Sequence, residues 1–414
     1  MKASSTPSKH FLWGVATSAH QVNGNCYDDW SEWELKNAHR LVTKNSDLKR
    51  FDTESDIFDT TSKPENYISG KACNHWELYK EDFELLKTLG CNAYRFSFDW
   101  ARIEPKEGFF DPVVIQHYQE MLKDLKQKNI TPFATLWHWT TPIWFSNKGG
   151  WLNKRSLFYF QRFTEKIVDC FGTEIKFWTP LNEPIVYATQ SYLVGRWPPQ
   201  KINPFSWFKV KNRLILAHQI SYKTIKAKFP NSQVGIAHNM VHLEPYRNLF
   251  INRVINSFCD HYINKRFLQK NKKYLDFIGV NYYFSILHHF GKIKKTGRPE
   301  SDINWELHPE GLYHILCTLR EYHIPIYITE HGLADHNDTQ RSWYIRESLH
   351  SMEKAILEGI DVRGYFHWSF LDNFEWHKGF WPRFGLVEID YHTLQRKPRS
   401  SFYSYKKIIK NSNL

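Results

Sequence analysis

Cysteines are few in this chain, and no motif pairs them. Six occur among the 414 residues, all far apart: Cys26, Cys73, Cys91, Cys170, Cys259 and Cys317. A disulfide framework or a cysteine-based zinc site would show closer or repeated spacing, such as Cys-x-x-Cys. A His-Glu-x-x-His motif is also absent, and the pair His288-His289 has no spaced third ligand. We therefore expect reduced thiols, a cytoplasmic location and no bound metal ion.

Long apolar runs are missing as well. The N-terminal stretch MKASSTPSKHFLWGVATSAHQ has only a short apolar segment, interrupted by Gly14 and by polar residues. A secretory signal needs an apolar core of about 7–15 residues, and a membrane-spanning helix needs about 18 or more. We therefore expect neither a signal peptide nor a membrane partner.

Acidic residues are outnumbered by basic ones. The chain has 43 Asp and Glu against 55 Lys and Arg, which gives a net charge of +12. Such an excess can serve binding to nucleic acid, but the densest basic cluster, NKRFLQKNKKY (264–274), has no zinc-finger or RNA-binding signature beside it. A solvated Lys-rich face is the favoured interpretation, and we expect no nucleic-acid partner. A nucleic-acid binder remains an alternative, and its DNA binding would depend steeply on salt.

Eight short β-rich runs are present, and most are followed by a helical pattern. They cover residues 11–19, 92–98, 131–138, 176–183, 233–238, 276–283, 325–331 and 362–370. Among the helices, 75–89 should end at Gly90, and the next should have Asp111 as its N-cap and Pro112 in its first turn. This alternation predicts an α/β protein, a single (β/α)8 TIM barrel that forms one catalytic domain over residues 1–414. A polar insert at about 37–71 is expected to form surface loops beside the site.

Two glutamates stand at the C-terminal ends of expected strands, where barrel enzymes place their chemistry. Glu183 ends the fourth strand and Glu330 the seventh, so both should face one cavity in a chain that is 17% aromatic. Two carboxyl groups across a pocket are the machinery of glycoside hydrolysis. The alternative is that each glutamate only pairs with an arginine at the barrel rim.

Seven sequence blocks carry a resemblance to a known family. In order, they are FLWGVATSAHQVNG, YRFSFDWARIEP, GGWLN, LNEP, GVNYY, ITEHG and WSFLDNFEWHKGFWPRFGLVEID. They resemble successive blocks of the family 1 glycoside hydrolases, the β-glucosidase family, from residue 11 to about 403. The resemblance implies hydrolysis with retention of anomeric configuration, through a covalent glycosyl-enzyme, and it implies no cofactor.

The resemblance also implies residue roles. Glu183 matches the general acid/base, which must hold a proton, and Glu330 matches the nucleophile, which must be ionised. Residues that match the supports of these two glutamates are Arg95, Asn182, Asn281 and Tyr283. Residues that match the sugar-binding positions, where Asn182 also contributes, are Gln21, His138, Trp139, Trp368, Glu375, Trp376 and Phe384. Each has a structural alternative: Gln21 could cap a helix, His138 could be a satisfied core histidine, and Trp368 could be barrel core.

The resemblance narrows the substrate to unphosphorylated sugars. The 6-phospho-glycosidases of the family carry a small hydroxyl residue where this chain has Glu375. We expect an exo-β-glycosidase that acts on small β-D-glucosides, and also on β-D-galactosides or β-D-fucosides. A catalytically silent sugar-binding barrel and a transglycosylase are the alternatives. The sequence does not indicate the natural aglycone or the oligomeric state.

Some positions depart from the family pattern. Asn23 replaces a usual Glu, Thr140 a usual Asp and His331 a usual Asn, and Trp381-Pro382 replaces Ser-Lys. His331 directly follows the expected nucleophile Glu330, so His331 could adjust the charge of Glu330 or the shape of the pocket. Trp381 and Pro382 are expected to line the rim.

Overall fold

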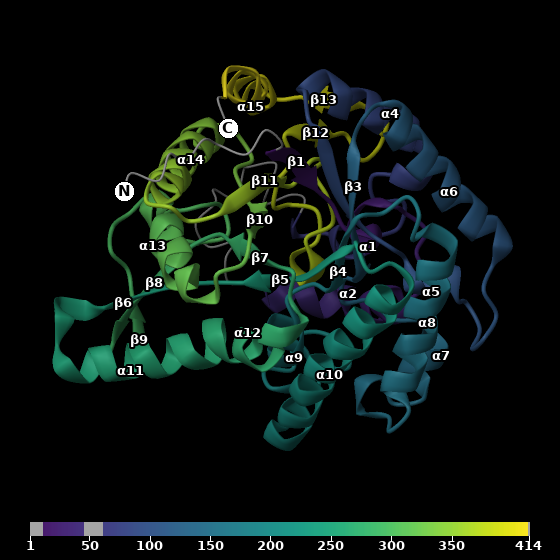
Figure 1. Ribbon diagram of the computed structural model, residues 1–414, viewed down its shortest axis with the longest axis horizontal. Helices are drawn as coiled ribbons and strands as arrows, with labels where there is room; N and C mark the ends of the chain where they lie inside the picture. Colours follow the sequence, from purple (N-terminus) through teal and green to yellow (C-terminus); the bar gives the residue numbers. More distant parts are fainter. Residues whose placement is uncertain (1–10, 45–60, 413–414) are drawn as a thin grey trace.

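The computed structural model of this protein describes residues 11–44 and 61–412. Eight parallel strands close into a barrel in the order β1-β11-β10-β7-β5-β4-β3-β2 (Figure 1). Their bounds are β1 (Leu12–Ala16), β2 (Ala93–Ser97), β3 (Thr131–Trp137), β4 (Phe177–Leu181), β5 (Gln233–Asn239), β7 (Phe277–Tyr282), β10 (Ile326–His331) and β11 (Val362–Trp368). Every strand begins within one residue of the predicted run, and the (β/α)8 TIM barrel is confirmed.

An outer layer of helices surrounds the strands in Figure 1. The helices of this layer include α4 (His75–Leu89), α6 (Pro112–Gln127), α8 (Ser156–Phe171), α10 (Pro204–Lys228), α12 (Arg266–Asn271), α13 (Pro309–Leu319), α14 (Arg341–Leu357) and α15 (Ser400–Asn411). Further helical elements are α1 (Ala19–Val22), η2 (Pro64–Tyr67), α5 (Trp100–Ile103), α7 (Ile143–Asn147), η3 (Gly150–Leu152), α9 (Pro184–Tyr192), η7 (Arg320–Tyr322) and η8 (Trp376–Lys378). Within the described ranges, no helix has the length and apolarity to cross a membrane.

Both predicted helix-end signals are confirmed. The backbone of Gly90 has φ 90°, a left-handed conformation that ends α4 and that glycine adopts without steric cost. The Asp111 carboxylate accepts hydrogen bonds from Val113 N and Val114 N in the first turn of α6, so it caps that helix.

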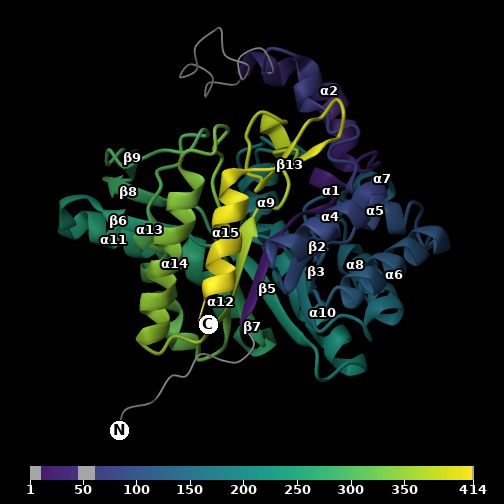
Figure 2. The ribbon, with the colours of Figure 1, turned by 90° about the horizontal axis from the view of Figure 1, so that it is seen from above.

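The polar insert differs from the prediction in part. Residues 37–44 are not loop but the end of helix α2 (Asp29–Lys44), and residues 45–60 lie outside the described part of the chain. Within the described part of the insert (61–71), Asn66 contacts the loop after β11: its Oδ1 accepts a hydrogen bond from Phe380 N at 3.0 Å and its Nδ2 donates to the carbonyl of the cavity residue Lys378 at 3.3 Å. Helix α2 lies at the top of Figure 2, at the same end of the molecule as β13 (Arg396–Pro398), which pairs with β12 (Val387–Ile389).

Aromatic rings fill the interior of the barrel. Phe133 stacks on Phe177 with ring centroids 5.3 Å apart and meets Phe277 edge-on at 5.2 Å. Tyr327 and Phe366 complete this cluster, so five strands each contribute one ring. The barrel is therefore a packed core and not a pore, and a ligand can only occupy one of its ends.

Candidate active site

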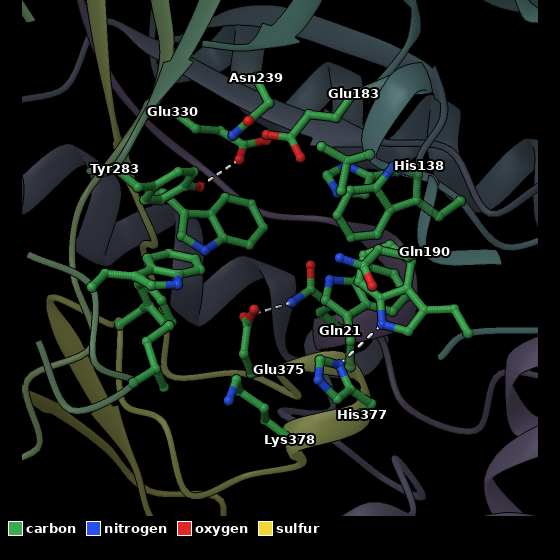
Figure 3. A pocket seen from close by; sticks show the side chains of 18 of the residues that line it. Gln21, His138, Glu183, Gln190, Asn239, Tyr283, Glu330, Glu375, His377 and Lys378 are labelled. Carbon is green, nitrogen blue, oxygen red and sulfur yellow. Dashed lines mark hydrogen bonds between the residues drawn. The ribbon is translucent and has the colours of Figure 1, made fainter. Parts of the chain in front are cut away.

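A cavity of about 440 Å³ opens at the C-terminal ends of the strands (Figure 3). The predicted site residues that line it are Gln21, His138, Trp139, Glu183, Tyr283, Glu330, Trp368, Glu375, Trp376 and Phe384. The other three, Arg95, Asn182 and Asn281, are fully buried and bond to the cavity residues from behind. The structure thus brings together all thirteen side chains, although they come from distant parts of the sequence.

Glu183 occupies the turn between β4 and α9. Its backbone has φ 40°, a left-handed conformation that costs a non-glycine residue about 1–3 kcal/mol and that ends the strand abruptly. Its amide donates to Ala237 O of β5 at 2.8 Å, and its Oε1 accepts from Asn281 Nδ2 at 2.7 Å. Burial raises the pKa of Glu183 to about 8, and the nearby charge of Glu330 adds to the rise. Glu183 therefore holds a proton at neutral pH.

Glu330 lies on β10, and Figure 3 shows its carboxyl group facing that of Glu183. Tyr283 donates its hydroxyl to Glu330 Oε2 at 2.5 Å, and Arg95 forms an ion pair with Oε1. Burial and the charge of Glu330 raise the pKa of Tyr283 well above its ordinary value, so the phenol stays protonated and keeps donating. Glu330 thus has a buried counter-charge and a fixed orientation.

The alternative that each glutamate only pairs with an arginine at the barrel rim does not fit the structure. Glu330 does pair with an arginine, but Arg95 lies behind the wall and leaves the carboxyl group facing the cavity. Glu183 is hydrogen-bonded by the neutral amide of Asn281 and, among the described residues, forms no ion pair. The two carboxyl groups therefore share one cavity in different environments.

A network of amides connects the acids to the sugar-binding wall. Asn182 Oδ1 accepts from Arg95 Nη2 at 2.7 Å, and Asn182 Nδ2 lies 3.0 Å from His138 Nε2. Burial and the Arg95 charge lower the pKa of His138 well below its ordinary value, so the ring is neutral. His138 Nδ1 is buried and has no partner among the described residues, so His138 is not a satisfied core histidine. One nitrogen of this cavity-lining ring is therefore left without a hydrogen bond.

Gln21 and Glu375 form a second polar group on the wall opposite the two glutamates (Figure 3). Gln21 lies inside α1 and caps no helix; its Nε2 donates to Phe374 O at 2.9 Å and to Glu375 Oε2 at 3.4 Å. Burial raises the pKa of Glu375 to about 8, and the nearby Lys378 opposes the rise. A carboxyl group with this pKa can both donate to and accept from a hydroxyl.

Aromatic side chains form most of the remaining wall. The ring of Trp139 lies 4.8 Å from that of Trp376 and 4.6 Å from that of Trp197, and Trp139 Nε1 donates to Asn182 O at 2.9 Å. Trp368, at the end of β11, is exposed to the cavity and is not only barrel core. Flat apolar faces with a few polar groups suit a pyranose ring, which has C–H faces and a rim of hydroxyls.

Sequence reasoning missed several cavity residues. Asn239 ends β5, and the same strand-end rule that selected Glu183 and Glu330 would have selected it. The others lie on the short helices α9 and η8 or in loops without a periodic sequence pattern. On α9 and η8 they are Val186, Gln190, His377 and Lys378, and in loops they are Arg196, Trp197, Phe284, Ile303 and Trp305.

The departures from the family pattern have different consequences. His331 does not line the cavity; its Nδ1 bonds to the Tyr365 hydroxyl at 2.8 Å, and burial lowers its pKa to about 3. It is therefore neutral and cannot alter the charge of the site. The prediction that Trp381 and Pro382 line the rim is wrong, because Trp381 is only 1% exposed and neither residue lines the cavity.

The other two departures from the family pattern, Asn23 and Thr140, also lie behind the cavity wall. Asn23 is buried, and its carbonyl accepts from Trp76 N at 3.3 Å. Thr140 offers its carbonyl to Trp137 Nε1 at 3.0 Å, while the neighbouring Thr141 N donates to Asp29 Oδ1 at 2.6 Å. An acid from α2 therefore lies next to the position where the family usually has Asp.

Comparisons with known proteins agree with this geometry. The model of Glycosyl hydrolase family 1 matches residues 3–268 and 256–414. A 1,4-beta-D-glucan glucohydrolase of Thermotoga neapolitana is 31% identical, with 98% of each chain covered, and a beta-galactosidase of Pyrococcus woesei is 28% identical over 98% of this chain and 97% of its own.

Solved structures extend the likeness to the whole fold. A beta-glycosidase from Pyrococcus horikoshii superposes with a TM-score of 0.86 at 35% identity, covering 98% of this chain and 95% of that one. The beta-glucosidase from Thermotoga maritima in complex with glucoimidazole gives a TM-score of 0.84 at 29% identity, covering 97% and 98%. This chain therefore belongs to glycosyl hydrolase family 1 and is a β-glycosidase that hydrolyses O-glycosyl bonds.

Proposed function

We propose that the protein is a retaining exo-β-glycosidase that releases unphosphorylated glucose from small β-D-glucosides, and that the chain works as one catalytic unit. The observation that carries this proposal is the pair of facing carboxyl groups in unlike environments: Glu183 is protonated, while Glu330 has Arg95 as counter-charge. A retaining glycosidase needs one protonated carboxyl group as the acid and one ionised carboxylate as the nucleophile.

In the first step, Glu183 donates its proton to the departing glycosidic oxygen while Glu330 attacks the anomeric carbon. The bond between that carbon and the leaving oxygen breaks, and an ester bond to Glu330 forms. The Tyr283 hydroxyl and the Arg95 guanidinium hold Glu330 in place for this attack. Direct attack needs carboxyl groups about 5 Å apart.

In the second step, the roles of Glu183 reverse. Esterification removes the negative charge of Glu330, which is the second-largest contribution to the raised pKa of Glu183. The pKa of Glu183 then falls, so it can take a proton from the incoming water. Water displaces Glu330 from the anomeric carbon and the sugar leaves with its original configuration.

The preference for an unphosphorylated sugar is supported by Glu375. We assign the 4- and 6-hydroxyls of the sugar to Glu375, Gln21 and Trp376, with Trp368 beneath the ring. His138 is assigned to the 2- and 3-hydroxyls, and Asn182 supports its ring from behind the cavity wall. A phosphate on the 6-hydroxyl would bring a double negative charge into the same buried surroundings that already disfavour ionisation of Glu375. The names of several relatives, a beta-glucosidase and a beta-galactosidase among them, agree with a glucoside or galactoside substrate.

A panel of chromogenic aryl β-glycosides that differ only in the sugar tests the proposal. We expect the highest kcat/KM for the glucoside, galactoside or fucoside and at least about a hundredfold less for the 6-phosphoglucoside, since taking the charged phosphate out of water beside Glu375 costs roughly 3 kcal/mol or more. Proton NMR of the first-formed sugar should show the β-anomer. A first product in the α-configuration, or a preference for the 6-phosphoglucoside, would contradict it.

A further inference from the structure

An arm of the molecule projects from the barrel at the lower left of Figure 1. It consists of β6 (His242–Pro245), η4 (Tyr246–Asn248), α11 (Phe250–Asp260), β8 (Ser285–His289) and β9 (Lys292–Lys294). Asn252 holds the arm together: its Nδ2 donates to Tyr246 O at 2.8 Å, and its Oδ1 accepts from Phe290 N at 2.8 Å. Helix α11 continues through η5 (His261–Lys265), α12 and η6 (Lys272–Tyr274).

The apolar side chains of α11 point outward, which is the reverse of an ordinary surface helix. Phe250, Val254 and Phe258, one turn apart, are 73%, 48% and 63% exposed. Ile251 and Tyr262 widen this face, and we call these five residues the apolar stripe. The opposite face turns polar groups inward, as Asn256 Nδ2 donates to Leu243 O at 3.0 Å. An exposed apolar face of this size indicates a binding surface.

The turn between β8 and β9 adds two more exposed apolar residues. Phe290 is 57% exposed and Ile293 66% exposed. The hydrogen bond from Phe290 N to Asn252 Oδ1 fixes this turn against the first turn of α11. The apolar surface of the arm therefore extends from the stripe to the hairpin tip.

The segment of the chain that contains the arm is rich in positive charge. Residues 247–295 contain ten Lys and Arg but only two acids, so this segment supplies eight of the twelve net charges of the chain. The ten are Arg247, Arg253, Lys265, Arg266, Lys270, Lys272, Lys273, Lys292, Lys294 and Lys295. Within the described part of the chain only Lys265 and Lys295 form ion pairs with carboxylates.

We propose that the arm docks on an anionic lipid surface. Helix α11 would lie in the plane of the membrane with the apolar stripe among the acyl chains and the cations at the phosphates, as a basic amphipathic helix does. A second copy of the chain fits less well, because a symmetric contact would bring two strongly cationic arms together. The sequence analysis expected a solvated face and no membrane partner, but it could not show that the stripe points outward.

Sedimentation of the full chain with lipid vesicles tests this docking. One set of vesicles is phosphatidylcholine alone and the other also contains phosphatidylserine. We expect binding only to the second, and weaker binding as salt is raised. The double variant Phe250→Ser/Phe258→Ser should bind at least about tenfold more weakly, because two exposed rings no longer enter the acyl region. The triple variant Arg253→Glu/Lys292→Glu/Lys294→Glu, which reverses cations of α11 and β9, should lose about as much or more.

Matched controls exist elsewhere on the surface. Phe205→Ser/Phe208→Ser removes two exposed rings from α10, and Lys406→Glu/Lys407→Glu/Lys410→Glu reverses three lysines on α15. Both controls should bind like the unaltered protein, and all variants should keep its rate on a chromogenic β-glucoside, which shows that they fold. Equal binding to both kinds of vesicle, or a stripe variant that binds normally, would overturn the proposal. So would a dimer in size-exclusion chromatography that the stripe variant abolishes.

Discussion

The raised pKa of Glu183 gives a direct test of the site. In the native protein burial and the charge of Glu330 raise this pKa to about 8. The substitution Glu330→Gln keeps the shape of the side chain but removes its charge. We expect the pKa of Glu183 to fall, because an ionised neighbour no longer opposes its ionisation.

The size of the effect follows from Coulomb's law. Two unit charges about 5 Å apart at an effective dielectric constant near 20 interact by roughly 3 kcal/mol, which corresponds to about 2 pH units. The substitution also leaves Arg95 without its partner carboxylate, and this unpaired cation favours ionised Glu183 in the same direction. We therefore expect the pKa of Glu183 in the variant to lie near 6.

The measurement is a pH titration by ¹³C NMR of protein labelled at the glutamate side-chain carboxyl carbons. Glu375→Gln is the matched control, because Glu375 lines the same cavity and is not among the main contributors to the pKa of Glu183. The control should leave the titration of Glu183 unchanged. If Glu183 titrates near 4 in the native protein, or if Glu330→Gln leaves its pKa at about 8, the two carboxyl groups do not interact and the assigned roles are wrong.

Four further substitutions have definite expected outcomes. Glu330→Ala should abolish turnover, and added azide should restore it with a product of inverted anomeric configuration, which NMR can identify. Glu183→Ala should react only with substrates that have activated leaving groups such as dinitrophenolate. A near-native rate in either variant would refute the role assigned to the substituted glutamate. Tyr283→Phe removes a hydrogen bond to a charged group worth about 1.5–3 kcal/mol, so kcat should fall about tenfold to a hundredfold; an unchanged kcat would show that this hydroxyl does not position Glu330. Phe133→Ala removes the central ring of the aromatic cluster inside the barrel and should lower the free energy of unfolding by about 3–5 kcal/mol, measured by urea denaturation. A loss below about 1 kcal/mol would contradict the packing described for the barrel.

Local signals in the sequence determined the fold. The strands could be located because each is a short β-rich run, and the ends of α4 and α6 because Gly90 and Asp111 have conformations and hydrogen bonds that depend on nearest neighbours. The two glutamates followed from their places at strand ends, since closure of a parallel barrel brings all such ends to one rim. These features depend on residues close in sequence and on one rule of topology.

Only the tertiary structure decided the rest. Trp197, Trp305 and Lys378 reach the cavity from connecting segments whose sequence has no periodic pattern. Trp381 is buried, although its position in the sequence suggested that it lines the rim. The proton on Glu183 and the neutrality of His138 depend on desolvation and on charges brought close by folding. The ten cations and the exposed apolar residues of the segment 247–295 likewise form a possible binding surface only because α11 turns its apolar face outward. The direction in which a helix face points is set by packing and not by the local sequence.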